Sequence, residues 1–146
     1  MTTTPAATPA ATPAATATSP RSPGVTAPRA RRFLLLDAWL TGANGLLYAA
    51  GGDWIAGWSG APAVLVHGLG AFLLLVAAAV AVLATRRPVP RRWLVALAGF
   101  NGVWVVASLD YAVVGGLDAP GVAWTVVQAA VVAAFAAEQL RLARRG

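Results

Sequence analysis

Polar side chains recur at helical spacing along the first long apolar stretch of the chain. Asp37, Thr41, Asn44 and Tyr48 stand at positions i, i+4, i+7 and i+11. At about 100° per residue they fall within an arc of about 60° on a helix. Such a stripe in an apolar helix is expected to face other protein and not lipid. A carboxylate, a hydroxyl, an amide and a phenol together could bind a small molecule or pass a proton.

Two further stretches supply polar groups of the same kind. Asn101 and Trp104, with Ser108 and Tyr111, fall within an arc of about 80°. Trp104 lies too deep for an interfacial anchor, so its indole N–H is expected to need a partner inside the protein. Asn44, Asn101 and Gln128 all lie near the middle of their segments, and we predict that these three amides lie close together.

Two interpretations of this polar cluster remain open. The favoured one is that its hydrogen bonds join helices, each contributing about 0.6 kcal/mol. The other is that the cluster lines a ligand site or a proton path.

The ionisable side chains divide between the two ends of the apolar segments. His67 and Asp110 lie near the same end, and a carboxylate–imidazole pair there could bind or relay a proton. A half-solvated, hydrogen-bonded histidine is the simpler expectation. Asp37 and Glu138 lie near the opposite end, where each is expected to pair with arginine.

Several classes of chemistry are excluded by composition. The chain has no cysteine and one histidine, which excludes disulfides, thiolate nucleophiles and a multi-histidine metal or bis-histidine haem site within one chain. It has no G-x-S-x-G, H-E-x-x-H or phosphate-binding motif. We therefore expect no catalytic residues, no metal site and no cofactor, and hence not an enzyme.

The elements that carry these residues are four apolar segments of 20–22 residues. Each is about 30 Å long as a helix, the thickness of the hydrocarbon core of a bilayer. The 146-residue chain is 58% hydrophobic and 11% charged, against about 25% charged residues in soluble domains. This pattern predicts an all-α, polytopic membrane protein, residues 31–146, with four transmembrane helices in an antiparallel up-down bundle. The predicted spans are 33–52, 64–85, 93–114 and 121–140.

All 11 basic residues are arginines, and they flank the segments on one side. The links at 53–63 and 115–120 contain none, so the positive-inside rule places both termini in the cytoplasm of a plasma membrane. We expect the arginines to contact anionic lipid headgroups and not nucleic acid. Besides Arg21 and Arg29, these anchors are Arg31, Arg32, Arg86, Arg87, Arg91, Arg92, Arg141, Arg144 and Arg145.

The two remaining regions are rich in proline. Residues 1–30 consist almost wholly of Thr, Ala, Pro, Ser and Arg and repeat Pro-Ala-Ala-Thr from Pro5, which predicts a disordered tail. The link at 86–92 is short and holds two prolines, so the second and third helices are expected to be antiparallel neighbours.

The stretch from Asp37 to Tyr48, together with Asn101-Gly-Val-Trp104, resembles uncharacterised four-span integral membrane proteins of high-GC actinobacteria. The resemblance extends over about 31–142 and implies a fold and a membrane, but no reaction. The leading expectation is an accessory or structural protein that acts through contacts with the lipid bilayer, other membrane proteins or a second copy. A small proton-coupled transporter and a lipid- or quinone-binding subunit are the alternatives.

Overall fold

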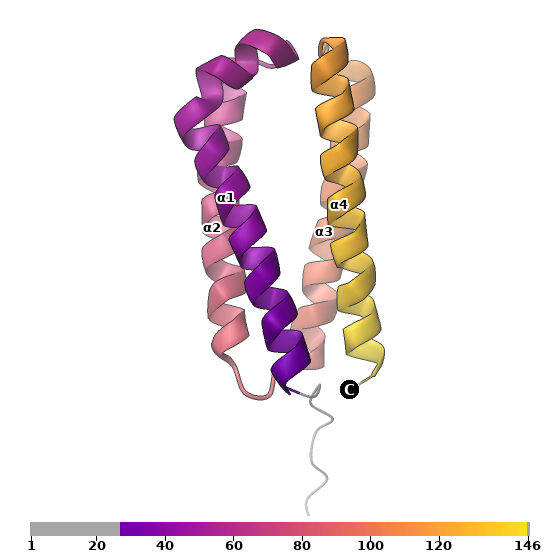
Figure 1. Cartoon of the computed structure of the whole chain (residues 1–146). Coiled ribbons are helices and arrows are strands. Elements are labelled where there is room, and N and C mark those ends of the chain that lie inside the picture. Colours follow the sequence, from indigo (N-terminus) through magenta and orange to yellow (C-terminus); the bar gives the residue numbers. More distant parts are fainter. Residues whose placement is uncertain (1–26, 146) are drawn as a thin grey trace, which may run out of the picture.

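The computed structural model describes residues 27–145, which are helical apart from short links. The helices are α1 (Ala27–Ser59), α2 (Ala63–Thr85), α3 (Arg91–Val114) and α4 (Ala119–Arg144), shown in Figure 1. All four are long and apolar enough to cross a membrane. Disorder was predicted for residues 1–30; of these, 1–26 lie outside the described residues, whereas the chain is helical from Ala27.

The helix α1 is longer than the predicted span at 33–52. It continues through the predicted link to Ser59, after a kink at Gly51, whose φ and ψ are −109° and 15°. Paired glycines are a common cause of such kinks, because they lack a Cβ and leave the helical conformation at low cost. Gly60 follows with φ of 75°, a left-handed conformation that suits glycine and ends the helix.

The helices pack as two pairs (Figure 1). We call α1 with α2 the first hairpin and α3 with α4 the second hairpin; close backbone packing lies mainly within each of them, with a smaller contact between α1 and α4. In the first hairpin small residues permit the close packing of the two backbones. A Cβ on Gly70 would lie only 2.4 Å from the backbone nitrogen of Ala49, so there is no room for a side chain at that position.

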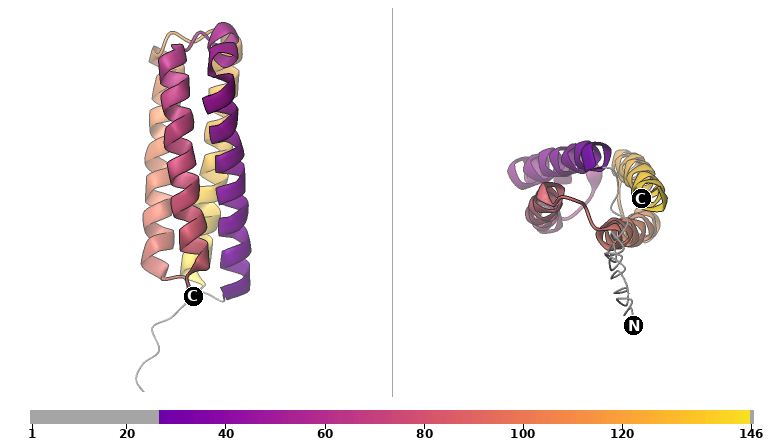
Figure 2. Two further views of the ribbon diagram at one scale, coloured as in Figure 1. Left: turned by 90° about the vertical axis from the view of Figure 1, so that its left-hand side faces the viewer. Right: turned by 90° about the horizontal axis from the view of Figure 1, so that it is seen from below.

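The helices α2 and α3, which were expected to be antiparallel neighbours, touch through side chains and not through close backbone packing. The link at 86–90 joins them, as the view from below shows (Figure 2), but their backbones do not form one of the closely packed pairs. Phe72 of α2 instead reaches Phe100 and Trp104 of α3, with ring centroids 6.2 Å and 5.7 Å apart. These large side chains hold the two backbones apart.

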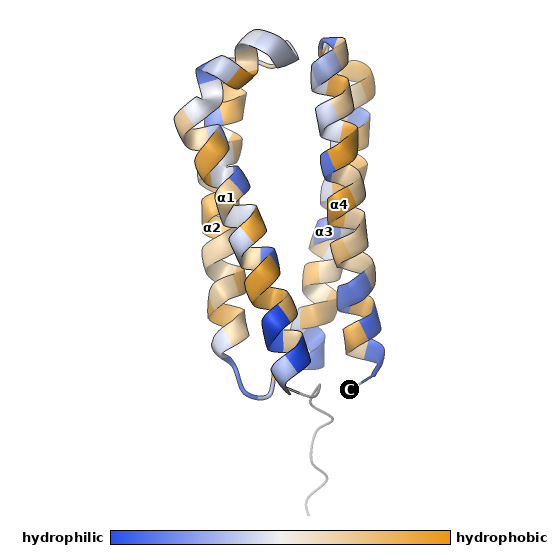
Figure 3. Cartoon of the chain, viewed as in Figure 1, coloured by the Kyte–Doolittle hydropathy of each residue, from blue (hydrophilic) through white to orange (hydrophobic). Residues whose placement is uncertain are grey.

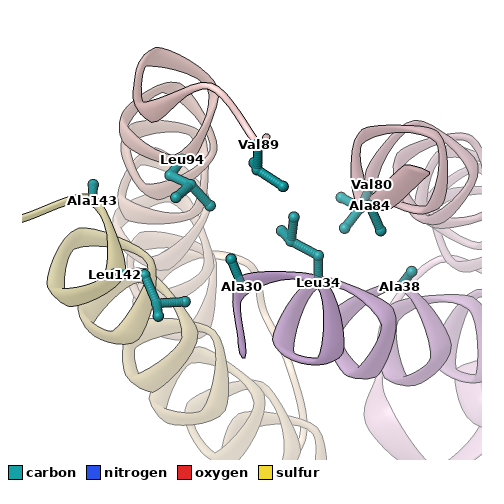
Figure 4. Packing of buried hydrophobic residues seen from close by; sticks show 9 residues of the cluster. All are labelled: Ala30, Leu34, Ala38, Val80, Ala84, Val89, Leu94, Leu142 and Ala143. Carbon is teal, nitrogen blue, oxygen red and sulfur yellow. The ribbon is translucent and has the colours of Figure 1, made fainter. Parts of the chain in front are cut away.

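Hydrophilic residues gather at the end of the molecule that holds the α2–α3 link and the C-terminus (Figure 3). We call this the inner end and the opposite one the outer end. Just inside it, apolar residues from all four helices and the link form a plug (Figure 4), in which Leu34, Val89 and Leu94 are 0% exposed. The plug comprises Ala30, Leu34, Ala38, Val80, Ala84, Val89, Leu94, Leu142 and Ala143.

Candidate functional site

A cavity of about 480 Å³ lies between the two hairpins and is lined by residues of all four helices. Its volume is within the range of about 300–1,000 Å³ that is typical of small-molecule sites. Most of its wall is aliphatic or aromatic, for example Leu69, Val132 and Phe135. Every residue of the predicted polar cluster also lines it, namely Asp37, Thr41, Asn44, Tyr48, Asn101, Trp104 and Gln128.

An inner polar network lies next to the apolar plug. The Thr41 hydroxyl donates to Asp37 Oδ1 at 3.2 Å, and Gln139 Nε2 donates to Asp37 Oδ2 at 2.9 Å. Asn101 Nδ2 in turn donates to Gln139 Oε1 at 3.1 Å. Asp37 and Gln139 are 4% and 0% exposed, so this network ties α1 to α3 and α4 out of contact with solvent.

Gln139 is the residue that sequence reasoning missed. It lies 11 positions after Gln128, so both fall on one face of α4, and this spacing could have identified it. Its presence also corrects the expectation that Asp37 pairs with arginine. Among residues 27–145 the partners of Asp37 are neutral, because Gln139 occupies its second oxygen while Arg31 and Arg32 are exposed. Glu138 does contact Arg141, at 3.5 Å.

An outer polar network joins α1 to α4. Asn44 Nδ2 donates to Gln128 Oε1 at 2.7 Å, while Gln128 Nε2 donates to the Tyr48 hydroxyl oxygen. The same oxygen accepts from Trp124 Nε1 at 2.8 Å. Tyr48 therefore accepts twice, and its own O–H donates to no other side chain or carbonyl within the described part of the chain.

The prediction that three amides meet is only partly met by this geometry. Asn44 and Gln128 are hydrogen-bonded, but Asn101 bonds Gln139 instead. The reason is the relative shift of α4 and α3, which places Asn101 level with Gln139, about three turns of α4 after Gln128.

The predicted pair of His67 and Asp110 is wrong. His67 donates from Nδ1 to the Ala49 carbonyl at 3.0 Å, and its Nε2 lies 3.5 Å from Asp53 Oδ1. Asp110 is exposed on the other hairpin. Because α1 continues as a helix beyond residue 52, Asp53 comes to lie beside α2, and neither His67 nor Asp110 lines the cavity.

The outer end of the cavity is closed by the kinked end of α1. The Ser59 carbonyl accepts the Asp118 N–H at 3.0 Å, and the Trp58 ring meets that of Trp124 edge to face at 6.2 Å. Ile55 and Ser59 are buried and line the cavity from this side. With the apolar plug at the inner end, both ends of the cavity are covered by protein.

The sides of the cavity are more open than its ends. Some of its lining side chains are also exposed, including Leu40 on α1, Phe100 on α3 and Val127 and Val131 on α4. An apolar opening between the helices faces a bilayer once the helices span it. A molecule would therefore reach the cavity sideways from lipid.

Trp104 does not find the polar partner expected for it. Its ring stacks on Phe72 at 5.7 Å with an interplanar angle of 11°, and its indole N–H makes no hydrogen bond within residues 27–145. Trp104 lines the cavity, so this N–H is a donor that the protein itself does not use. Trp58 Nε1, in the kinked end of α1, is buried and has no hydrogen-bond partner among residues 27–145.

The predicted arginine anchors of the described chain all lie at the inner end and are exposed. Arg91 also donates from Nε to the Ala143 carbonyl at 2.9 Å, which fastens the start of α3 to the end of α4. No group of three or more His, Cys, Asp or Glu side chains in residues 27–145 is placed to hold a metal ion. Comparison of the chain with protein-family models, curated proteins and solved structures gave no match.

Proposed function

We propose that this chain is a multi-pass protein of a bacterial plasma membrane, an antiparallel up-down bundle with both termini in the cytoplasm. Two features support this topology. The four helices have the length and hydropathy of membrane spans. All 11 arginines lie in the segments of the chain that the positive-inside rule assigns to one side.

The topology is tested by fusing alkaline phosphatase, which is active only after export, to either terminus or into the link after Gly60 or Gly116. Activity is expected for the two link fusions and not for the terminal ones. Export of either terminus would contradict the proposed orientation.

Within that bundle, the function that the geometry supports best is the binding of a small, mainly apolar molecule that carries a hydrogen-bond acceptor. The observation that carries this proposal is the central cavity, covered at both ends but open between the hairpins. Its wall is mainly apolar, and the donors that it leaves unused among the described residues include the Tyr48 O–H, the Trp104 N–H and the Tyr111 O–H. A carbonyl oxygen, as in a quinone or a fatty acyl ester, fits such donors.

A proton-coupled transporter fits this geometry less well. A path across the membrane needs polar groups or water from one face to the other, because each unsolvated polar group in an apolar region is costly. Here the apolar plug separates Asp37 from the inner end. Asp37 and Tyr48 also belong to two hydrogen-bond networks that share no member.

An accessory role through helix contacts is the second candidate. It is favoured by the observation that Asn44, Gln128 and Gln139 use their amides to bond α1 to the second hairpin. Such bonds stabilise a bundle that could present its lipid-facing surface to another membrane protein or to a second copy. This role predicts that altering the cavity leaves partner binding unchanged.

Quenching of tryptophan fluorescence by a short-chain benzoquinone tests the binding proposal, because Trp104 and Trp124 line the cavity. The purified protein in nanodiscs should show saturable quenching at one equivalent. Ala107→Phe, which adds a phenyl ring at an exposed position of the cavity wall, should raise the apparent Kd at least tenfold. Ala123→Phe is the matched control, since Ala123 is exposed and lines no cavity described here. Quenching that rises linearly with quinone, or equal loss in both variants, would refute specific binding.

A further inference from the structure

A second hollow lies between the inner halves of α2 and α3. It adjoins the central cavity, and the two share Val76, Val80, Leu97 and Phe100 in their walls. The second hollow has a volume of about 870 Å³ and exists because these helices are not closely packed and carry small residues there, among them Ala79 and Ala96. We call it the α2–α3 groove. Its apolar wall includes Val82, Leu83 and Phe100.

The mouth of the α2–α3 groove is basic. Arg86 at the end of α2 and Arg92 at the start of α3 both line it, and Trp93 stands beside them with 51% of its surface exposed. No carboxylate lines the groove, and neither arginine belongs to an ion pair within the described part of the chain. Two guanidinium groups at one end of an apolar groove suit a ligand with an anionic head and an apolar tail.

The length of the groove agrees with one leaflet of a bilayer. From Arg86 to Val76 the helix α2 rises about 15 Å, at about 1.5 Å per residue. Half of the hydrocarbon core is also about 15 Å thick. Trp93 lies at the depth of the headgroups in this arrangement, where tryptophan is enriched.

We propose that the α2–α3 groove binds an anionic phospholipid of the cytoplasmic leaflet. The phosphate lies between Arg86 and Arg92, and one acyl chain follows the groove towards Phe100. Charge selects this occupant over a second copy of the chain, because a copy brings its own arginines to the same depth. The proposal rests on the membrane insertion proposed above, but not on the ligand of the central cavity.

Native mass spectrometry of the detergent-solubilised full chain tests the headgroup contact. Phosphatidylglycerol and phosphatidylcholine with identical acyl chains are offered together, and the wild type should retain phosphatidylglycerol preferentially. The double variant Arg86→Gln/Arg92→Gln should lose roughly thirtyfold in this preference, which corresponds to about 1 kcal/mol for each arginine near anionic lipid. Arg144→Gln/Arg145→Gln removes the same charge from exposed positions outside the groove and should retain the preference.

A second pair of variants tests the acyl-chain contact. Ala96→Phe fills the groove and should reduce retention of phosphatidylglycerol about tenfold, whereas Ala107→Phe, which fills only the central cavity, should not. Inorganic phosphate at millimolar concentration should not displace the lipid. Displacement by phosphate would assign the site to a free anion, and a lipid-free wild-type dimer would assign the groove to a second copy.

The failures of the two proposals are distinguishable. The lipid site is refuted if both double arginine variants lose the preference for phosphatidylglycerol equally, or if Arg86→Gln/Arg92→Gln keeps it. In either case the phosphatase fusions still report on membrane insertion. Export of a terminus in those fusions refutes the topology whatever the lipid preference. Circular dichroism of each variant shows whether its helices persist.

Discussion

The two ends of the molecule are held together in different ways. At the inner end, buried Leu and Val side chains from four helices and a link pack on one another, as around Leu34 and Leu94. At the outer end the kinked end of α1 meets the α3–α4 link through the Ser59 carbonyl, and meets α4 through an edge-to-face tryptophan contact and a close approach at Gly121. The inner end is therefore stabilised by bulky side chains that fill the space between the helices. The outer end instead requires a glycine at position 121, because a side chain there would push the two segments apart.

This difference follows from the surroundings of each end. The plug lies beside the charged inner surface, where apolar side chains gain from leaving water as well as from dense packing. Deeper in a bilayer the first gain disappears, because lipid tails are as apolar as leucine, and close packing and hydrogen bonds take over. The cavity networks, which lie between the two ends, rely on these two terms, whereas the outer end relies on close backbone packing at Gly121.

The largest effect is expected in the plug. Leu34→Ala leaves a hole at a 0% exposed position of the plug, and should lower the free energy of unfolding by about 2–5 kcal/mol. Unfolding by dodecyl sulfate in mixed micelles, followed by circular dichroism, measures it. Leu46→Ala on the same helix is 60% exposed and should cost under about 1 kcal/mol; equal losses would show that the plug is not tightly packed.

At the outer end the sensitive change adds volume. A Cβ at Gly121 would lie 2.2 Å from the Ser59 carbonyl oxygen, so Gly121→Ala should push the kinked end of α1 away and cost about 1–3 kcal/mol. The same micelle titration measures it. Gly102→Ala in α3 meets nothing within 4 Å and should stabilise its helix by about 0.5–1 kcal/mol. A stabilising Gly121→Ala would mean that the two segments do not touch.

A smaller effect is expected in the outer polar network. Tyr48→Phe removes the oxygen that accepts from both Trp124 and Gln128, and bonds of this kind in membranes contribute about 0.6 kcal/mol, at most about 1.7. Thermal unfolding in detergent should show the loss. Tyr111→Phe serves as the control, because Tyr111 lines the cavity without a hydrogen bond from its hydroxyl to described residues. A larger loss in the control would overturn the assignment of this network.

The smallest effect belongs to the pair of His67 and Asp53. His67 Nε2 and Asp53 Oδ1 lie 3.5 Å apart, and the Asp53 side chain is 89% exposed, so water screens the contact. Asp53→Asn should change the free energy of unfolding by less than about 0.5 kcal/mol in the same thermal assay. A change above about 1 kcal/mol in the free energy of unfolding would show that this pair stabilises the outer end to an extent comparable with the packing of the plug at the inner end.

The polar cluster shows how far sequence reasoning extends to the site. The stripe on α1 was predictable, because four positions on one helix share a face whatever surrounds it. The bond between Asn44 and Gln128 followed from the depth of both residues. The partner of Asn101 did not, since it depends on how far α4 slides along α3, and this shift is set by packing between helices. The predicted pairing of His67 with Asp110 failed for a different reason. The helix α1 continues past residue 52 and brings Asp53 beside His67.

By itself the sequence determined the number of apolar helices, their approximate bounds and the gathering of arginines at one end, because these depend on local hydropathy and residue type. Tertiary structure alone decided how the end of α1 beyond the kink packs against the start of α4, the separation into two hairpins and the choice of Gln139 as partner of Asp37. Those features depend on the relative depth and rotation of helices distant in sequence. The relative depth and rotation of two helices are set by the volumes of the side chains where they touch. They therefore cannot be predicted from the periodicity of residues within a single helix.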